Sequence, residues 1–468
     1  MLIQGAAILT LDATDRFIAE GHVRIQDGRI IAVGPGSMTP EPGETVMDGR
    51  GRLVAPGLVN AHTHSQSATL PGFGDRLSHP AFMWLTQAHT ARRTPEETRL
   101  AVLLTAWAAL TTGTTALIDH FPGQRFTAAD LQAVLAAWHE TGLRATVGLR
   151  FFDAAFDDIA PPAAIESSAA LLHPQPLAEF HELAEEAIRK WHGRDGRLGV
   201  FPAPSNPDRC TDAALVLCAS LAEQFDTGIH THLLETSRQA SIAKSRHGIT
   251  TVAHLDRLGI LSDRWSCAHS TWLTPDDMAL MAAAGAVAVL NPESNARLGT
   301  GTADIPAMLR AGMRLALGTD GVGANDNLSM HEAMRAAATL HRATQPVRAD
   351  WVSARQSLAM ATAGGVAALR QDRVGAIAPG WAADLVLYRM DTPAWAALND
   401  PVAQLVFAET GSAVDTVMVA GEVLLSGGRP TRFDPVALSR EIAAMTASLR
   451  HRNADLFRAA DAIAGTLA

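Results

Sequence analysis

The chain has 468 residues, of which 47% are hydrophobic and 18% charged, a composition typical of a folded protein with a large core and not of a disordered one. Its net charge of −10 provides no basic surface for phosphate backbones, so nucleic acid is not an expected partner. Three cysteines without a C-x-x-C pair, no leader pattern and no run of about 18 apolar residues favour a cytoplasmic protein that does not enter a membrane.

Short β patterns separated by turn signals occupy both ends of the chain. Residues 6–11, 21–25 and 29–33 have this pattern, and so do residues 385–388, 414–419 and 423–425. Neither end is long enough to form a good sheet alone. We therefore expect residues 1–53 and 374–430 to form one small composite β-sandwich domain. Residues 431–468 are expected to be a helical segment that serves packing or subunit contact.

Between residues 54 and 373 short apolar runs alternate with alanine-rich helical stretches. Eight such runs follow one another in the chain, a number that favours a closed (β/α)8 TIM barrel over an open sheet. We expect this segment to be a metal-dependent catalytic barrel. The expected strands are residues 58–64, 114–119, 145–150, 198–201, 228–232, 265–269, 286–290 and 314–320.

Polar side chains follow four of these strands where each strand ends. His62 and His64 leave the first strand on the same side, because residues i and i+2 of a strand point the same way. His232, His269 and Asp320 end the fifth, sixth and eighth strands. Since functional residues of such barrels gather at this rim, the pattern predicts a site for a divalent ion, Zn²⁺ with Fe²⁺ as the alternative.

Two of these residues have competing interpretations. His230 and His232 form a second His-x-His pair, and His232 is preferred because it is nearer the strand end and three residues before Glu235. Asp320 could instead cap a following helix. Other histidines are interpreted as hydrogen-bonded core or surface residues, namely His120, His139 and His341.

Five motifs in this order resemble the amidohydrolase superfamily, specifically the branch of cytosine, guanine and methylthioadenosine/adenosylhomocysteine deaminases and triazine hydrolases. The resemblance covers nearly the whole chain and implies a barrel with a composite sandwich. Binuclear relatives use a lysine at the end of strand four, where this chain has none, so one metal is implied. The motifs are PGLVNAHTH at residues 56–64, HTHLLET at 230–236, CAHS at 267–270, NPESN at 291–295 and LGTDG at 317–321.

The resemblance also implies roles. His62, His64, His232 and Asp320 would bind the metal, whose bound water has a lowered pKa and attacks an amidine-like ring carbon. Asp320 would accept the water's proton, His269 would orient the attacking oxygen, and Glu235 would protonate a neighbouring ring nitrogen. The expected activity is hydrolytic deamination of a small ring such as isocytosine, cytosine, guanine, a pterin or an s-triazine. The alternatives are a chlorohydrolase or alkylaminohydrolase with the same site, and a non-catalytic scaffold.

Substrate contacts are expected near the metal. Gln66 follows the metal pair, and Trp84 belongs to an expected long loop, residues 65–91, that would overhang the site. Ser205 stands where the methylthioadenosine/adenosylhomocysteine deaminases carry a histidine, which argues against a nucleoside of that kind. Relatives are commonly homodimers or larger, and the same is expected here. Further polar lining is expected from Asn206, Asn295 and Asn325.

Overall fold

Eight parallel strands form the centre of the molecule. The structure, a computed structural model, describes residues 1–122, 125–154, 173–345 and 347–466. The strands form two four-stranded sheets, and β9 lies against β10 while β13 lies against β6, so that the ring closes. The predicted TIM barrel is confirmed. Its strands are β6 (Leu58–Thr63), β7 (Thr114–Phe121), β8 (Arg144–Phe151), β9 (Leu198–Pro204), β10 (Ile229–Leu233), β11 (Trp265–His269), β12 (Val287–Leu290) and β13 (Arg314–Leu317).

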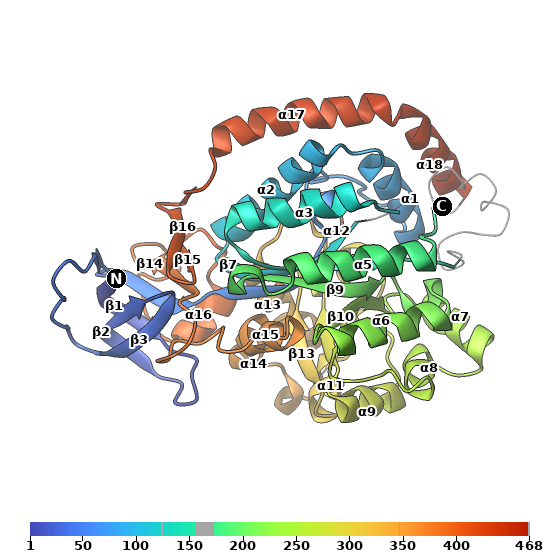
Figure 1. Ribbon diagram of the computed structural model, residues 1–468. Helices are drawn as coiled ribbons and strands as arrows, with labels where there is room; N and C mark the ends of the chain where they lie inside the picture. The colour runs from blue at the N-terminus through green and yellow to red at the C-terminus, as the bar shows by residue number, and fades with distance from the viewer. Residues whose placement is uncertain (123–124, 155–172, 346, 467–468) are drawn as a thin grey trace.

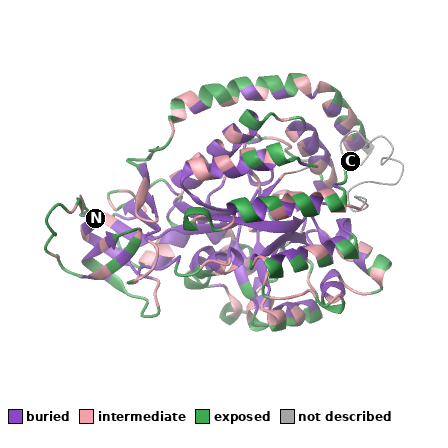
Figure 2. Cartoon of the chain, in the orientation of Figure 1, coloured by how far each residue is buried: buried purple, intermediate pink, exposed green. Residues whose placement is uncertain are grey.

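Helices surround this ring and bury its strands (Figures 1 and 2). The first two begin at capping boxes, in which a threonine accepts a backbone N–H three residues on and an acidic side chain accepts the threonine N–H, as at Thr94 and Glu97. The helices are α2 (Pro95–Thr111), α3 (Ala128–Thr141), α5 (Leu177–Trp191), α6 (Asp212–Gln224), α7 (Ser237–His247), α8 (Thr251–Arg257), α9 (Pro275–Ala284), α11 (Ile305–Arg310), α13 (Met330–Thr339), α14 (Ala354–Ala359) and α15 (Gly365–Ala368).

Short helices also occupy segments that follow barrel strands. Residues 65–91 are not the long loop expected from the sequence, because they contain the helix α1 (His79–Thr90), which begins after the extended residue Ser78. Pro80 near its start suits a helix, since a first-turn proline removes a donor that has no partner there. The others are α10 (Pro292–Arg297) and α12 (Val322–Asn325), whereas α16 (Pro401–Phe407) lies between two strands outside the barrel, residues 385–389 and 414–419.

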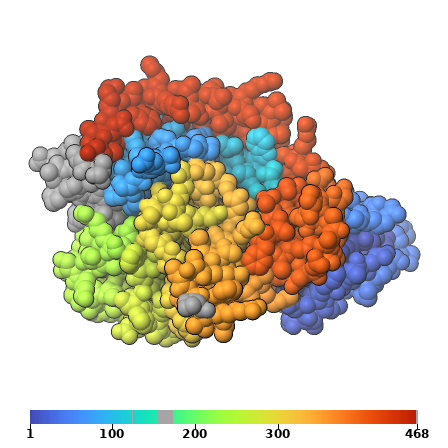
Figure 3. Space-filling view, turned by 180° about the vertical axis from the view of Figure 1, so that it is seen from behind, coloured from blue at the N-terminus to red at the C-terminus, as the bar shows by residue number. Residues whose placement is uncertain are grey.

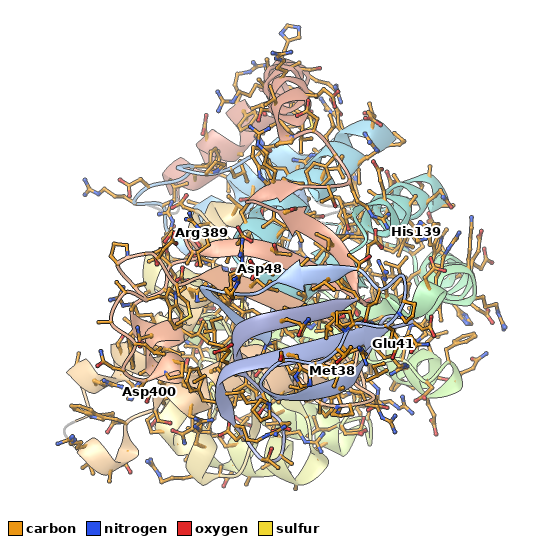
Figure 4. All side chains as sticks on the ribbon, turned by 90° about the vertical axis from the view of Figure 1, so that its left-hand side faces the viewer. Met38, Glu41, Asp48, His139, Arg389 and Asp400 are labelled. Carbon is orange, nitrogen blue, oxygen red and sulfur yellow. The ribbon has the colours of Figure 1, made fainter. Side chains whose placement is uncertain are left out.

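Strands from both chain ends pair in one nine-stranded sheet, seen face-on in Figure 4 with Asp48 on it. The ends meet where β14 runs antiparallel to β5. The strand pairing gives a single sheet, so the two-layer sandwich that we expected is not confirmed. The strands are β1 (Leu2–Leu9), β2 (Phe17–Gln26), β3 (Arg29–Pro35), β4 (Val46–Asp48), β5 (Arg52–Pro56), β14 (Leu385–Arg389), β15 (Val414–Val419), β16 (Glu422–Ser426) and β17 (Arg429–Pro430).

Only Gly57 separates β5 of this sheet from β6 of the barrel. A Cβ atom at Gly57 would lie 2.1 Å from Thr115 Oγ1, so no larger residue fits without movement of β7. The chain therefore passes from the terminal sheet directly into the strand that carries His62.

A carboxyl-terminal arm, α17 (Pro435–Arg452) and α18 (Ala454–Thr466), runs along α2 and reaches α1 (Figures 1 and 3). Leu438, Met445 and Leu449 of α17 pack on Leu100 and Leu103 of α2. Where the two arm helices meet, the amide of Asn453 donates to the carbonyl oxygens of Ala88 at 3.0 Å and Ala91 at 2.8 Å. None of the helices in the described ranges combines the length and apolar character that crossing a membrane requires.

Candidate active site

Imidazoles and one carboxylate converge at the carboxyl ends of the barrel strands. Nε2 of His64 lies 3.1 Å from Nε2 of His232. Oδ1 of Asp320, the third residue after β13, lies 3.4 Å from Nε2 of His64 and 3.6 Å from Nε2 of His62. The barrel thus brings together the four residues that the family resemblance implied as metal ligands.

The protonation of two imidazoles tests whether a cation fits there. Nδ1 of His64 donates to the carbonyl oxygen of His120 at 2.8 Å, and Nδ1 of His232 donates to that of Ser205 at 2.5 Å. A neutral imidazole carries one N–H, so both Nε2 atoms must then be acceptors. Two acceptors that face each other at 3.1 Å repel unless a cation lies between them, and the donor set of nitrogens and one carboxylate oxygen suits Zn²⁺.

Burial keeps these imidazoles neutral. It lowers the pKa of His64 to about 3 and lowers the pKa values of His62 and His232 below the ordinary range, so a lone pair on each ring is available to a metal. Nε2 of His62 is buried and has no hydrogen-bond partner in the parts of the chain described. An orphaned buried nitrogen of this kind is unfavourable unless something binds it.

His230 and His120 surround this cluster in different ways. Nε2 of His230 lies 2.8 Å from Nδ1 of His62, on the side of the ring away from Asp320, and its Nδ1 lies 2.7 Å from Ser266 Oγ. His230 therefore orients His62. His120 was interpreted as a core or surface residue, but its ring lies 4.6 Å from that of His232, and it belongs to the group of imidazoles whose ligand atoms lie within 4.8 Å of one another.

Asp320 is fixed by its neighbours. Its Oδ2 accepts from Ser294 Oγ at 2.6 Å and its Oδ1 from the N–H of Gly321 at 2.6 Å. Burial opposes ionisation, yet the adjacent imidazoles, His62 first among them, hold the pKa of Asp320 well below its usual value. The N-cap of α12 is Gly321, so Asp320 is not that helix's capping residue.

His269 and Glu235 lie beside the cluster with a residue that the sequence analysis missed. Asn295 Nδ2 donates to Nδ1 of His269 at 3.2 Å, which leaves the proton of His269 on Nε2, 3.9 Å from Oε2 of Glu235. His79, in the first turn of α1, places its Nε2 3.2 Å from the same oxygen. Although burial acts against it, His269 and His79 lower the pKa of Glu235 to about 2, so this carboxylate is ionised.

A second missed residue is Arg150, at the end of β8, which lines the open side of the site with His79. The cleft has a volume of about 540 Å³ and is open to solvent. Arg150 donates from Nε to Ser205 Oγ at 3.1 Å. A polar residue at the end of a buried strand was a signal in the sequence for Arg150, whereas His79 lay inside the expected loop. Apolar lining comes from Phe82, Met83, Leu298 and Ala324.

Of the six residues expected to contact substrate, Gln66 is the one that lines the cleft, and its Oε1 is buried without a partner in the described chain. Trp84 lies in α1, fully buried in the hydrophobic core, because this helix turns Phe82 and Met83 toward the cleft and Trp84 away from it. Asn295 supports His269 from behind. Ser205 accepts from Arg150, Asn206 caps the N–H of Asp208 at 2.9 Å, and Asn325 donates to the carbonyl oxygen of Thr319 at 2.9 Å.

Comparisons with known proteins agree with this geometry. Residues 53–424 match the Amidohydrolase family. A 5-methylthioadenosine/S-adenosylhomocysteine deaminase of Nitratidesulfovibrio vulgaris is 35% identical over 452 residues, which is 94% of this chain and 96% of that protein. A 5'-deoxyadenosine deaminase of Methanosarcina mazei is 31% identical over 93% of this chain and 94% of its own.

Two solved structures have the same fold. An adenosine deaminase from Xanthomonas campestris with bound zinc has a TM-score of 0.85 at 28% identity and covers 96% of this chain and 98% of its own. The atrazine chlorohydrolase TrzN from Arthrobacter aurescens, complexed with zinc, has a TM-score of 0.87 at 24% identity and covers 95% of this chain and 99% of its own. At that identity, the second likeness concerns the fold alone.

Proposed function

Because the chain belongs to the amidohydrolase family, we propose that it is a metal-dependent deaminase that hydrolyses an exocyclic amino group from a small aminated N-heterocycle and releases ammonia. The enzyme class expected from the sequence, a hydrolase of C–N bonds in cyclic amidines, is confirmed by family and relatives. The identity of the ring is the part that we propose.

The proposed cofactor is one Zn²⁺ ion held by His62, His64, His232 and Asp320. The two facing Nε2 atoms of His64 and His232 and the orphaned Nε2 of His62 support this ligand set. When bound, a divalent ion supplies Lewis acidity and lowers the pKa of water toward neutrality. Three other expectations stay predictions: the cytoplasmic location, the assembly as a homodimer or larger, and the domain boundaries suggested by the sequence.

The protein's own residues would then move two protons. Asp320, ionised and bound on both oxygens by donors, accepts a proton from the attacking water. Because Asn295 donates to Nδ1 of His269, the N–H of His269 is on Nε2 and points toward the attacking water. This N–H stabilises the negative charge that develops on the oxygen as it bonds to the ring carbon.

Glu235 acts in this proposal as a shuttle and not as a resident acid. Its pKa of about 2 means that it starts as a carboxylate, so it first takes up one proton of the attacking water and delivers it to the ring nitrogen. The second proton of the water, accepted by Asp320, then passes to the departing amine, which leaves as ammonia. His79 and His269, on either side of its Oε2, hold it in place.

The candidate rings are isocytosine, cytosine, guanine, a pterin and an s-triazine, and the names of the relatives add adenine nucleosides. Ser205, which stands in place of a histidine, argues against these nucleosides as substrates, because it hydrogen-bonds Arg150 and does not line the cleft.

One observation carries the proposal: a buried, ionised glutamate between two imidazoles, Glu235, at the edge of an imidazole and carboxylate cluster that suits zinc. The test is ammonia release by zinc-loaded protein across the panel of rings, with and without a chelator. We expect release from one ring class that the chelator abolishes. Metal-bound protein that releases no ammonia, but releases chloride or an alkylamine from triazines, would replace deamination with the alternative hydrolysis.

A further inference from the structure

A second cavity adjoins the active-site cleft. It has a volume of about 640 Å³ and lies between the turn that joins α1 to α2 and the end of β7. Gln66 and Thr90 line both cavities, so the two cavities are neighbours. Phe121, Phe126 and Arg93 also line the second cavity.

Arg93 differs from the other charged residues there. Its Nε and Nη1 atoms are buried and have no hydrogen-bond partner in the described residues, and its Nη2 makes one long contact, 3.5 Å to Thr69 Oγ1. Burial lowers the pKa of Arg93 to about 10, so the side chain keeps its positive charge at neutral pH. A buried guanidinium with open donors is costly unless an anion binds it.

No neighbouring carboxylate among the described residues binds Arg93. Glu97, three residues after Thr94, is bound by Arg452 through two hydrogen bonds of 2.7 and 2.8 Å. His89 contributes no charge, because burial and the nearby Arg93 lower its pKa to about 3.

The two other arginines of the cavity wall are paired with carboxylates, and the one carboxylate of the wall, Asp130, is hydrogen-bonded to a threonine. Arg92 binds Asp455 through two hydrogen bonds of 2.9 and 2.8 Å, and Arg125 pairs with Glu179. Asp130 accepts from the N–H and hydroxyl of Thr127, both at 2.8 Å.

We propose that this second cavity is a subsite for an oxyanion, a carboxylate or a phosphate, carried by the substrate and bound by Arg93 while the ring occupies the metal cleft. A guanidinium presents parallel N–H donors that match either group, and apolar walls strengthen that contact by excluding water. The inference rests on the proposed function for the identity of the ring, but the positive charge of Arg93 in the second cavity does not depend on that function. It narrows the substrate class to anionic heterocycles.

The first experiment uses matched ligand pairs that differ in the anion. Pterin and pterin-6-carboxylate form the carboxylate arm, and adenosine and adenosine 5'-monophosphate form the phosphate arm. Each is titrated calorimetrically into zinc-loaded E235Q protein, so that turnover does not interfere, with and without R93Q. We expect the anionic member of one arm to bind about 10- to 100-fold tighter than its neutral partner and R93Q to remove that preference, as for a charge-assisted hydrogen bond.

R50Q is the matched control, because Arg50 is exposed in the turn between β4 and β5 and its loss changes the net charge equally. R50Q should retain the preference, whereas R93K should retain part of it, since lysine keeps the charge and loses the planar fork. Equal affinity of both members in the parent protein, or an unchanged preference in R93Q, would overturn the subsite. The arm that shows the preference identifies the anion.

A second measurement separates this inference from the proposed function. The melting temperature of the zinc-loaded wild-type and R93Q proteins is compared in acetate, phosphate and chloride at equal ionic strength. Stabilisation by acetate or phosphate that is lost in R93Q, with no ring bound by either protein, would reject the heterocycle substrate and retain the subsite. Anion effects that are equal in both proteins, together with ring pairs that show no preference, would reject the subsite whatever the ring chemistry.

R93Q should also be at least as stable as the wild type in chloride, because it removes a buried cation that binds no carboxylate. A clear loss of stability would mean that Arg93 is structural.

Discussion

Asp119 ties the first metal-binding strand to the barrel wall, and its replacement by asparagine has a calculable effect. Its Oδ1 accepts the N–H of Ser65 at 2.8 Å, and its Oδ2 accepts Ser65 Oγ at 2.6 Å and Trp138 Nε1 at 2.8 Å. All three are donors, so an amide NH₂ at either position faces a donor. In D119N one of these donors therefore faces another donor, and the two other hydrogen bonds become weaker. We expect the free energy of unfolding to fall by about 2 to 4 kcal/mol.

The functional effect follows from the chain connection, because Ser65 is next to His64. A loosened Ser65 lets the His64 ring rotate, and the expected loss of zinc affinity is about 10- to 100-fold, as for other groups that orient metal ligands. The assays are urea unfolding of the metal-free protein and competition for zinc with a chelating dye.

The control is D277N on α9. Asp277 is also buried and accepts three donors, namely the N–H and hydroxyl of Thr274 at 2.9 and 2.8 Å and the hydroxyl of Thr250. It lies outside the metal cluster, so D277N should lose comparable stability and keep its zinc affinity. If D119N bound zinc as tightly as D277N does, the argument that Asp119 orients His64 would be wrong.

Three other predictions concern proton positions. E235Q should lower kcat by about 10²- to 10⁴-fold with unchanged zinc affinity, because the shuttle is lost and the ligands remain. H79Q should raise the pKa of Glu235 from about 2, so the acid limb of kcat/KM should move to higher pH. Burial and Glu332 raise the pKa of Glu293 to about 8, so the folded state holds a proton that the unfolded chain releases above about pH 4.5. The free energy of unfolding should therefore fall by about 1 to 3 kcal/mol between pH 5 and 8, and E293Q should abolish this fall.

Each of these three predictions has a result that would contradict it. Full turnover in E235Q would assign the proton transfer elsewhere. For H79Q, an acid limb that stays in place while kcat falls would make His79 a packing residue only. Urea midpoints of the wild type that do not change between pH 5 and 8 would contradict the protonated Glu293.

The convergence of His62, His64, His232, His269 and Asp320 could be predicted because parallel strands of a barrel end at one rim, so sequence position alone brings their side chains together. The helix α1 could not be predicted as easily, since its hydrophobic periodicity is weak and it lies in a segment between strand and helix. Because this helix was expected to be a loop, Trp84 was predicted to contact the substrate and His79 was not recognised as part of the site.

Residues that act through others were the hardest to predict. The carbonyl oxygen of His120, Nε2 of His230 and Nδ2 of Asn295 each contact a ring nitrogen of another histidine of the site. These contacts depend on which strands are neighbours, and the sequence carries no sign of such pairing. Arg93 was missed for a different reason: it follows another arginine in a polar stretch, where charged residues are usually solvated.

The carboxyl-terminal arm has a practical consequence for anyone who handles this enzyme. Asn453 holds the carbonyl oxygens of Ala88 and Ala91, and Arg452 holds Glu97, so the last two helices anchor the turn that carries Arg93. A protease cut before residue 435 is expected to loosen a wall of the proposed anion subsite while leaving the proposed metal ligands intact. Preparations that carry full metal but bind ligand poorly should therefore be checked first for the integrity of that arm.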